Sequence, residues 1–211
     1  MTIFSWIIVG LIVGALAKLV MPGRDPGGMI VTIILGIAGS LLGGGIGRAP
    51  GNGSRPAFPI ADQVAQLNRQ LFETTNAHTY ATFFYAVYDD TDGRLTYTNA
   101  GHLPPLIVNA KGIRRLECGG TVIGIFPEAP YEQESVILQP GDLLVAYTDG
   151  ISEPENPYGG EFGEARLIEV LQKVLNRPPK EVAQAILDAV LAWSDTPEAH
   201  DDMTLLVARR T

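Results

Sequence analysis

Residues 140–153 read PGDLLVAYTDGISE, and this stretch does most to decide the fold. An uninterrupted apolar run from Leu143 to Tyr147 follows a Pro-Gly-Asp turn. A short apolar run bounded by turn residues is typical of a buried strand. The run stops at Thr148 and Asp149, so the sequence predicts a carboxylate at the end of a central strand.

Strand patterns also precede this stretch. Residues 79–88 are rich in Thr, Phe, Tyr and Val, and the turn DDTDG at 89–93 leads into the alternating segment 94–98. Turn chemistry and period together predict a hairpin. We expect further strands at 106–109, 122–126 and 132–138.

Helical patterns flank the strands. Apolar residues recur at helical spacing from residue 61, and again over 163–175 and 178–193, before a closing strand at 203–209. Antiparallel strands with helices grouped late predict a layered α+β domain over 61–211.

Two aspartates are candidate metal ligands. Asp149 ends one predicted strand, and Asp201 shortly precedes the last one. Carboxylates at strand ends can converge on hard cations such as Mg²⁺ or Mn²⁺. On spacing alone, a turn or cap role for each aspartate remains the competing interpretation. The acidic run 89–92 is interpreted as hairpin-turn residues.

Other catalytic patterns are absent from the sequence. His78, His102 and His200 are scattered, without the spacing of a nucleophile and its base, and no phosphate-binding glycine loop follows a strand. The single cysteine, Cys118, cannot form an internal disulfide. No catalytic residue is therefore assigned.

The first 46 residues have a different character. Residues 3–20 and 29–46 are almost wholly apolar and are separated by a Pro/Gly-rich turn, which predicts a two-helix transmembrane hairpin. A cleaved signal peptide is the alternative, but a basic n-region and a cleavage site are lacking. Residues 47–60 are expected to form a Gly/Pro-rich linker.

Small residues recur every four positions in both apolar segments. This spacing suits close helix packing, either within the hairpin or between copies in a homo-oligomer, although small residues are also simply common in membrane helices. The stripe includes Gly10, Gly14, Gly36, Ser40 and Gly44.

Charge separates the two parts of the chain. Residues 1–55 carry four basic residues and one acidic residue, whereas the remainder carries 11 basic and 22 acidic residues. The acidic part argues against nucleic acid as a partner, because binding phosphates needs a basic face. The basic residues beside the apolar segments suit the headgroups of a lipid bilayer.

The N-terminal segment resembles a family of small membrane proteins. The stretch KLVMPGRDPGG at residues 18–28, with the apolar run before it, is similar to the transglycosylase-associated (GlsB/YeaQ/YmgE) family. That resemblance implies the bacterial inner membrane. The third hydrophobic helix usual in that family is not present here.

The later segment resembles the SpoIIE/RsbU-type branch of the PPM serine/threonine phosphatases. The matching motifs are YATFFYAV at 80–87, GRLTYTNAGHLPPL at 93–106, PGDLLVAYTDGISE at 140–153 and HDDMTLLV at 200–207. The resemblance implies a partial αββα sandwich. It also implies Mn²⁺ or Mg²⁺ as cofactor and phosphoserine regulatory proteins, of the anti-sigma-factor antagonist type, as cytoplasmic substrates.

Residue by residue, Asp149 and Asp201 match two metal ligands of that family, and Asp202 matches a supporting neighbour. The family's first half, with the Gly-Asp motif whose aspartate bridges both metals, is missing from this chain. Gly141 and Asp142 belong to a later motif and cannot replace it.

Three interpretations follow. The chain is a membrane-anchored phosphatase whose metal centre is completed from elsewhere, or a pseudophosphatase that binds partners without turnover. The third interpretation is a small membrane protein with a degenerate tail, or a fusion of two gene fragments.

Overall fold

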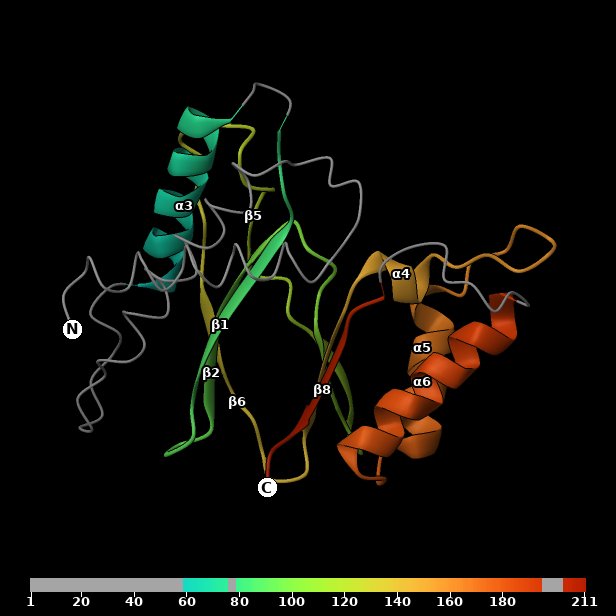
Figure 1. Cartoon of the computed structure of the whole chain (residues 1–211). Coiled ribbons are helices and arrows are strands. Elements are labelled where there is room, and N and C mark those ends of the chain that lie inside the picture. The colour runs from blue at the N-terminus through green and yellow to red at the C-terminus, as the bar shows by residue number, and fades with distance from the viewer. Residues whose placement is uncertain (1–58, 76–78, 195–202) are drawn as a thin grey trace, which may run out of the picture.

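The computed structural model of the chain describes residues 59–75, 79–194 and 203–211. Over these residues the chain forms four layers, with one helix on one outer face, two β-sheets in the middle and three helices on the other outer face (Figure 1). The α+β class and the αββα order of layers expected from the sequence are confirmed.

The first layer is helix α3 (Ile60–Thr74), which the sequence predicts from residue 61. Its buried face carries apolar residues at helical spacing, including Val64, Leu67 and Leu71, and these pack on Ala100 of the first sheet and on Ile123. Asn68 lies on the same face and bonds the loop beyond, because its Nδ2 donates to the Phe126 carbonyl at 2.7 Å and its Oδ1 accepts from Gly124 N at 2.8 Å.

The first sheet is built on the predicted hairpin. Strand β1 (Phe83–Asp89) pairs antiparallel with β2 (Arg94–Ala100), in a register that sets Asp89 opposite Arg94. Strand β6 (Glu134–Ile137) and the short β5 (Gly119–Gly120) pair with the other edge of β2.

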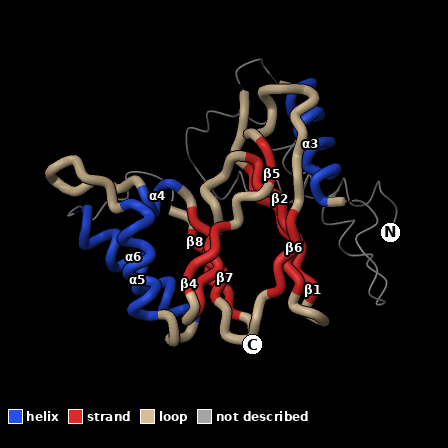
Figure 2. The backbone as a smooth tube through the Cα atoms, turned by 180° about the vertical axis from the view of Figure 1, so that it is seen from behind, coloured by secondary structure: helices blue, strands red, loops and turns tan. Residues whose placement is uncertain are grey.

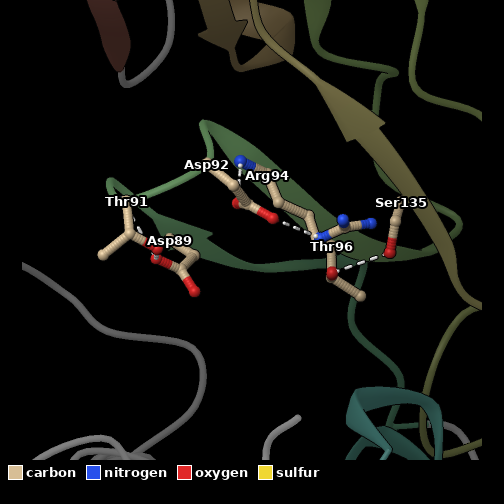
Figure 3. A network of polar contacts seen from close by, with 6 residues as sticks. All are labelled: Asp89, Thr91, Asp92, Arg94, Thr96 and Ser135. Atoms are coloured by element: carbon tan, nitrogen blue, oxygen red, sulfur yellow. Dashed lines mark hydrogen bonds and ion pairs between the residues drawn. The ribbon is translucent and has the colours of Figure 1, made fainter. Parts of the chain in front are cut away.

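The hairpin turn is closed by its own carboxylates (Figure 3). Asp89 Oδ1 accepts from the Thr91 amide at 3.0 Å, and Asp92 Oδ1 accepts from the Arg94 amide at 2.9 Å. Gly93 has φ +73°, a conformation that favours glycine. The interpretation of residues 89–92 as turn residues is therefore confirmed.

The second sheet contains the apolar run Leu143–Tyr147 as strand β7. Strand β7 (Leu143–Tyr147) lies between β3 (Leu106–Asn109) and β8 (Leu205–Arg209), and β4 (Gly112–Arg115) completes the sheet on the far side of β3. All neighbouring pairs are antiparallel.

Helices cover the outer face of the second sheet (Figure 2). The short α4 (Asp149–Ser152) is followed by α5 (Gly163–Val174) and α6 (Pro179–Ser194), close to the two predicted ranges. Leu167, Leu171 and Ile186 are fully buried in the core that these helices share with β7 and β8.

The strand expected at 122–126 is wrong. Of these residues, Ile123 makes a single bridge to Ala81, and the chain then turns at Gly124, which has φ +97°. A Cβ at Gly124 would lie 2.7 Å from the Thr79 carbonyl oxygen, so a close backbone approach takes the place of a ladder. Strands β4 and β5 and helix α4 were not among the elements predicted from the sequence.

The predicted transmembrane hairpin at 1–46 lies outside the described residues, as does all but the end of the linker at 47–60. Within 59–75, 79–194 and 203–211, every helix is too short or too polar to cross a bilayer.

Burial in the helix-covered core gives a stability prediction. Leu171 is fully buried, whereas Leu191 of α6 is 40% exposed. We expect Leu171→Ala to lower the free energy of unfolding by about 2–5 kcal/mol, because the substitution leaves a cavity. Leu191→Ala serves as the control and should cost much less. Urea unfolding of the full chain in detergent measures both values, and equal losses would contradict this packing.

Candidate functional site

The candidate ligand Asp149 lies where β7 becomes α4. It is the first residue of that short helix and is exposed to solvent, and its Oδ1 accepts a hydrogen bond from the Gly150 amide at 2.9 Å. A negative charge in the first turn of a helix stabilises that helix. Asp149 is therefore also placed for the turn or cap role that its position in the sequence left open. Its carboxylate is nevertheless open to a ligand.

The start of β8 lies beside Asp149. The Thr148 amide donates to the Thr204 carbonyl at 3.1 Å, and the Thr204 amide donates back to Thr148 Oγ1 at 2.9 Å. These two bonds extend the β7–β8 ladder to the residue before Asp149. The second candidate ligand, Asp201, lies outside the described residues, together with Asp202, His200 and His78.

A histidine from the other sheet faces this region. His102 follows β2, and Asn99 holds its backbone on both sides. Asn99 Oδ1 accepts from the His102 amide at 2.8 Å, and Asn99 Nδ2 donates to the His102 carbonyl at 3.0 Å. The side chain is fixed as well, since His102 Nδ1 lies 3.3 Å from Thr82 Oγ1. The imidazole is therefore a half-buried, oriented group.

Electrostatics connects His102 to Asp149. Burial lowers the pKa of His102, and the negative charge of Asp149 partly offsets this by raising it. The charge acts across the two sheets, so the structure brings these side chains to one end of the sandwich. His102 had no role predicted from the sequence, although it belongs to the motif Asn-Ala-Gly-His at 99–102.

Asp142 lies at the opposite end of β7 from Asp149 and has a structural role. Its side chain is buried, and it accepts hydrogen bonds from Asn109 Nδ2 at 2.9 Å and from the Gln139 amide at 2.8 Å. This placement agrees with the inference that the Gly-Asp pair at 141–142 does not replace the missing metal-binding motif.

Of the two candidate metal ligands, only Asp149 lies among the described residues. Mg²⁺ and Mn²⁺ prefer oxygen ligands, so the exposed carboxylate of Asp149 suits them. Within the described part of the chain, however, nowhere do three or more His, Cys, Asp or Glu side chains gather closely enough to hold a metal ion. A complete site therefore needs at least one ligand from outside these residues.

A family model for stage II sporulation protein E (SpoIIE) matches residues 12–211. The chain belongs to the SpoIIE family. This membership confirms the resemblance that the motifs around Asp149 and His102 indicated.

Among curated proteins, phosphoserine phosphatase RsbU of Bacillus subtilis is 31% identical over 149 residues, which cover 70% of this chain and 44% of RsbU. The chain thus spans less than half the length of this relative. The N-terminal segment has a separate relative, UPF0410 protein YeaQ of Escherichia coli, which is 53% identical over 67 residues, 32% of this chain and 82% of YeaQ.

Among solved structures, the SiaA-PP2C domain of Pseudomonas aeruginosa superposes with a TM-score of 0.69 at 21% identity. The match covers 90% of this chain and 73% of that one. This likeness shows that the SpoIIE-family domain has the PP2C-type fold.

The partial burial of His102 predicts that the stability of the fold depends on pH. With its pKa lowered in the folded state, the ring is neutral there, while the unfolded state takes up a proton below about pH 6.5. The contribution of His102 to stability is therefore present above pH 6.5 and is lost as the pH falls through the folded-state pKa.

NMR titration of the full chain in metal-free buffer checks this, with His102→Gln assigning the signal. We expect a pKa for His102 below 6.5, and a still lower pKa in Asp149→Asn, because the substitution removes the neighbouring negative charge. A higher pKa in the Asp149→Asn variant would show that the two side chains are not neighbours.

Proposed function

We propose that the chain is a membrane-anchored serine/threonine phosphatase of the PPM type, with Asp149 and Asp201 as ligands of Mn²⁺ or Mg²⁺. The observation that carries the proposal is the pair of hydrogen bonds between Thr148 and Thr204 at the exit of β7. These bonds start the last strand next to Asp149.

Chain length supports the role of Asp201. Two residues lie between Asp201 and Thr204, so Asp201 is three Cα–Cα steps, or at most about 11 Å, along the chain from Thr204. This short spacing supports a role for Asp201 beside Asp149. Two carboxylates in such an arrangement suit a hard divalent cation better than either one alone.

A bound divalent cation would supply a polarised phosphoryl oxygen and an activated water. Residues of this chain would bind the cation and orient the substrate. Asp149 would hold the cation, and His102 would present its ring to the substrate. When the Thr82 hydroxyl donates to Nδ1, the proton of the neutral ring lies on Nε2 and can be donated to a phosphoryl oxygen.

The proposed location is the bacterial inner membrane, with the domain from residue 61 onward in the cytoplasm. Support comes from the two apolar segments within residues 1–46 and from the similarity of the N-terminal segment to YeaQ. The proposed substrates are phosphoserine regulatory proteins of the anti-sigma-factor antagonist type, in line with the name of RsbU as a phosphoserine phosphatase.

The loop between α4 and α5 is a candidate substrate contact. It leaves α4 directly after the Asp149 turn, and Trp193 holds it near its tip by donating from Nε1 to the Gly160 carbonyl at 2.8 Å. Tyr158, two residues before Gly160, is 95% exposed. An exposed aromatic side chain on a held turn suits recognition of a protein surface.

A second candidate function is phosphoprotein binding without turnover. The observation in its favour is that a three-ligand group is lacking in the described part of the chain. In that case the domain would bind a phosphoserine peptide and release no phosphate.

Phosphate release from a phosphoserine peptide, with Mn²⁺ and the full chain in detergent, tests the proposal. We expect Mn²⁺-dependent release that falls in Asp149→Asn and Asp201→Asn by more than the roughly 10–100-fold typical for loss of a supporting residue. Asp90→Asn in the hairpin turn is the matched control and should leave the rate unchanged.

Peptide binding by the wild-type chain without any phosphate release would contradict the enzyme and establish the binding module. Release that both active-site variants retain would show that other residues hold the metal.

A further inference from the structure

Strands β1 and β8 are the outer strands on the same side of the two sheets. Among the described residues, β1 pairs only with β2 and β8 pairs only with β7. Each strand therefore presents one edge of backbone N–H and C=O groups without a neighbouring strand in this part of the chain. An unpaired edge is a template for pairing with another strand.

The composition of these two strands is that of covered strands. β1 reads FFYAVYD and β8 reads LLVAR, so each is apolar or aromatic except for its last residue. Exposed edge strands in natural proteins are usually protected by inward-pointing charges, Pro or Lys. Neither strand has such protection along its length, so the edge of each is suited to pairing with another strand.

On this side the two sheets do not end at the same level, and we call the offset between β1 and β8 the step. On β7, Leu144 packs in the core between the sheets with Phe84 and Ala86 of β1. On β8, the residues of the same face are Leu206 and Ala208, and both are exposed, Leu206 by 52%. Within the described residues, the second sheet thus extends one strand beyond β1, and nothing in this part of the chain covers the inner face of that strand.

The directions of the strands limit what can fill this step. The turn after β1 and the end of β8 meet at one end of the molecule, since the Leu138 amide donates to the Gly93 carbonyl at 2.9 Å and Arg210 Nη1 donates to the Leu138 carbonyl. β1 and β8 therefore run toward the same end, as the ribbon shows (Figure 1).

We propose that the step is filled by a second copy of this chain, related by a two-fold axis that runs along the strands between the two sheets. In this arrangement β8 of the second copy lies beside β1 and over the bare face of β8. The two Leu206 side chains meet near the axis. Each copy fills the step of the other, so the interface closes as a dimer.

Charge at the strand ends fits the same arrangement. β1 ends at Asp89, in the acidic turn of Figure 3, and β8 ends at Arg209, which Arg210 follows. Both guanidinium groups donate to neutral carbonyls of their own chain, so their positive charges remain at this end. A two-fold axis along the strands keeps their direction, so the acidic end of β1 lies beside the basic end of β8 of the second copy. Opposite charges at a contact favour this pairing over others.

The interface leaves the candidate site open. Asp149 and the start of β8 lie at the opposite end of the strands from Arg209 and Arg210. Dimerisation through these edges therefore does not depend on phosphatase activity, and the two proposals can fail separately.

Light scattering on the full chain in detergent, with the mass of bound detergent subtracted, tests the dimer. We expect about twice the chain mass of 22.6 kDa for the wild type and a single chain mass for Leu206→Lys. Ile137→Lys is the matched control, because Ile137 is a 44% exposed apolar residue on β6, on the other side of the sheet, and this variant should remain dimeric.

A wild-type chain of single mass would overturn the proposal, and so would a Leu206→Lys chain that stays dimeric. A second measurement tests the contact if Leu206→Lys does not fold. In a Cys118→Ser background, Leu206→Cys should form a disulfide-linked dimer under mild oxidation and Ile137→Cys should not. The absence of that link would equally overturn the proposed two-fold contact.

Discussion

The apolar layer between the two sheets holds the functional parts of this protein in place. Leu95, Tyr97 and Leu116 are buried in it, and a polar contact closes one side. There, Glu134 of the first sheet accepts from the Tyr97 hydroxyl at 2.5 Å and from Arg114 of the second sheet at 2.6 Å. Since His102 follows a strand of the first sheet and Asp149 follows a strand of the second, their proximity depends on this contact between the sheets.

Much of the fold could be predicted from local patterns. The hairpin at 83–100, strand β7 and helices α5 and α6 have strong periodicity, and the structure places them near their expected positions. Strand β5 could not be found in this way, because two glycines carry no strand pattern. Gly119 lies so close to β2 that a Cβ there would be 1.9 Å from the Asn99 carbonyl oxygen, a requirement visible only in three dimensions.

The residues of the candidate site also differ in how far the sequence predicts them. Asp149 could be predicted because the end of an apolar strand places it. His102 could not be assigned a role, because its approach to Asp149 comes from the packing of two sheets and from the Asn99 clamp, neither of which has a sequence period. The placement of Asp201, the domain limits and the membrane hairpin remain predictions.

The exposed face of β8 and the single described candidate ligand agree with one feature of the sequence. The Gly-Asp motif expected from the family resemblance is not found in the sequence before α3. Within the described residues, the domain has a SpoIIE-family fold in which β1 and β8 each have one edge without a neighbouring strand. Such an edge leaves Leu206 of β8 exposed among these residues.

Calorimetric titration of Mn²⁺ into the metal-free full chain tests the central claim most directly. The account predicts weak binding at a single site in the wild-type chain, and at least an order of magnitude lower affinity in Asp149→Asn. Two tight sites, or identical binding curves for the two proteins, would contradict a metal centre built on the end of β7.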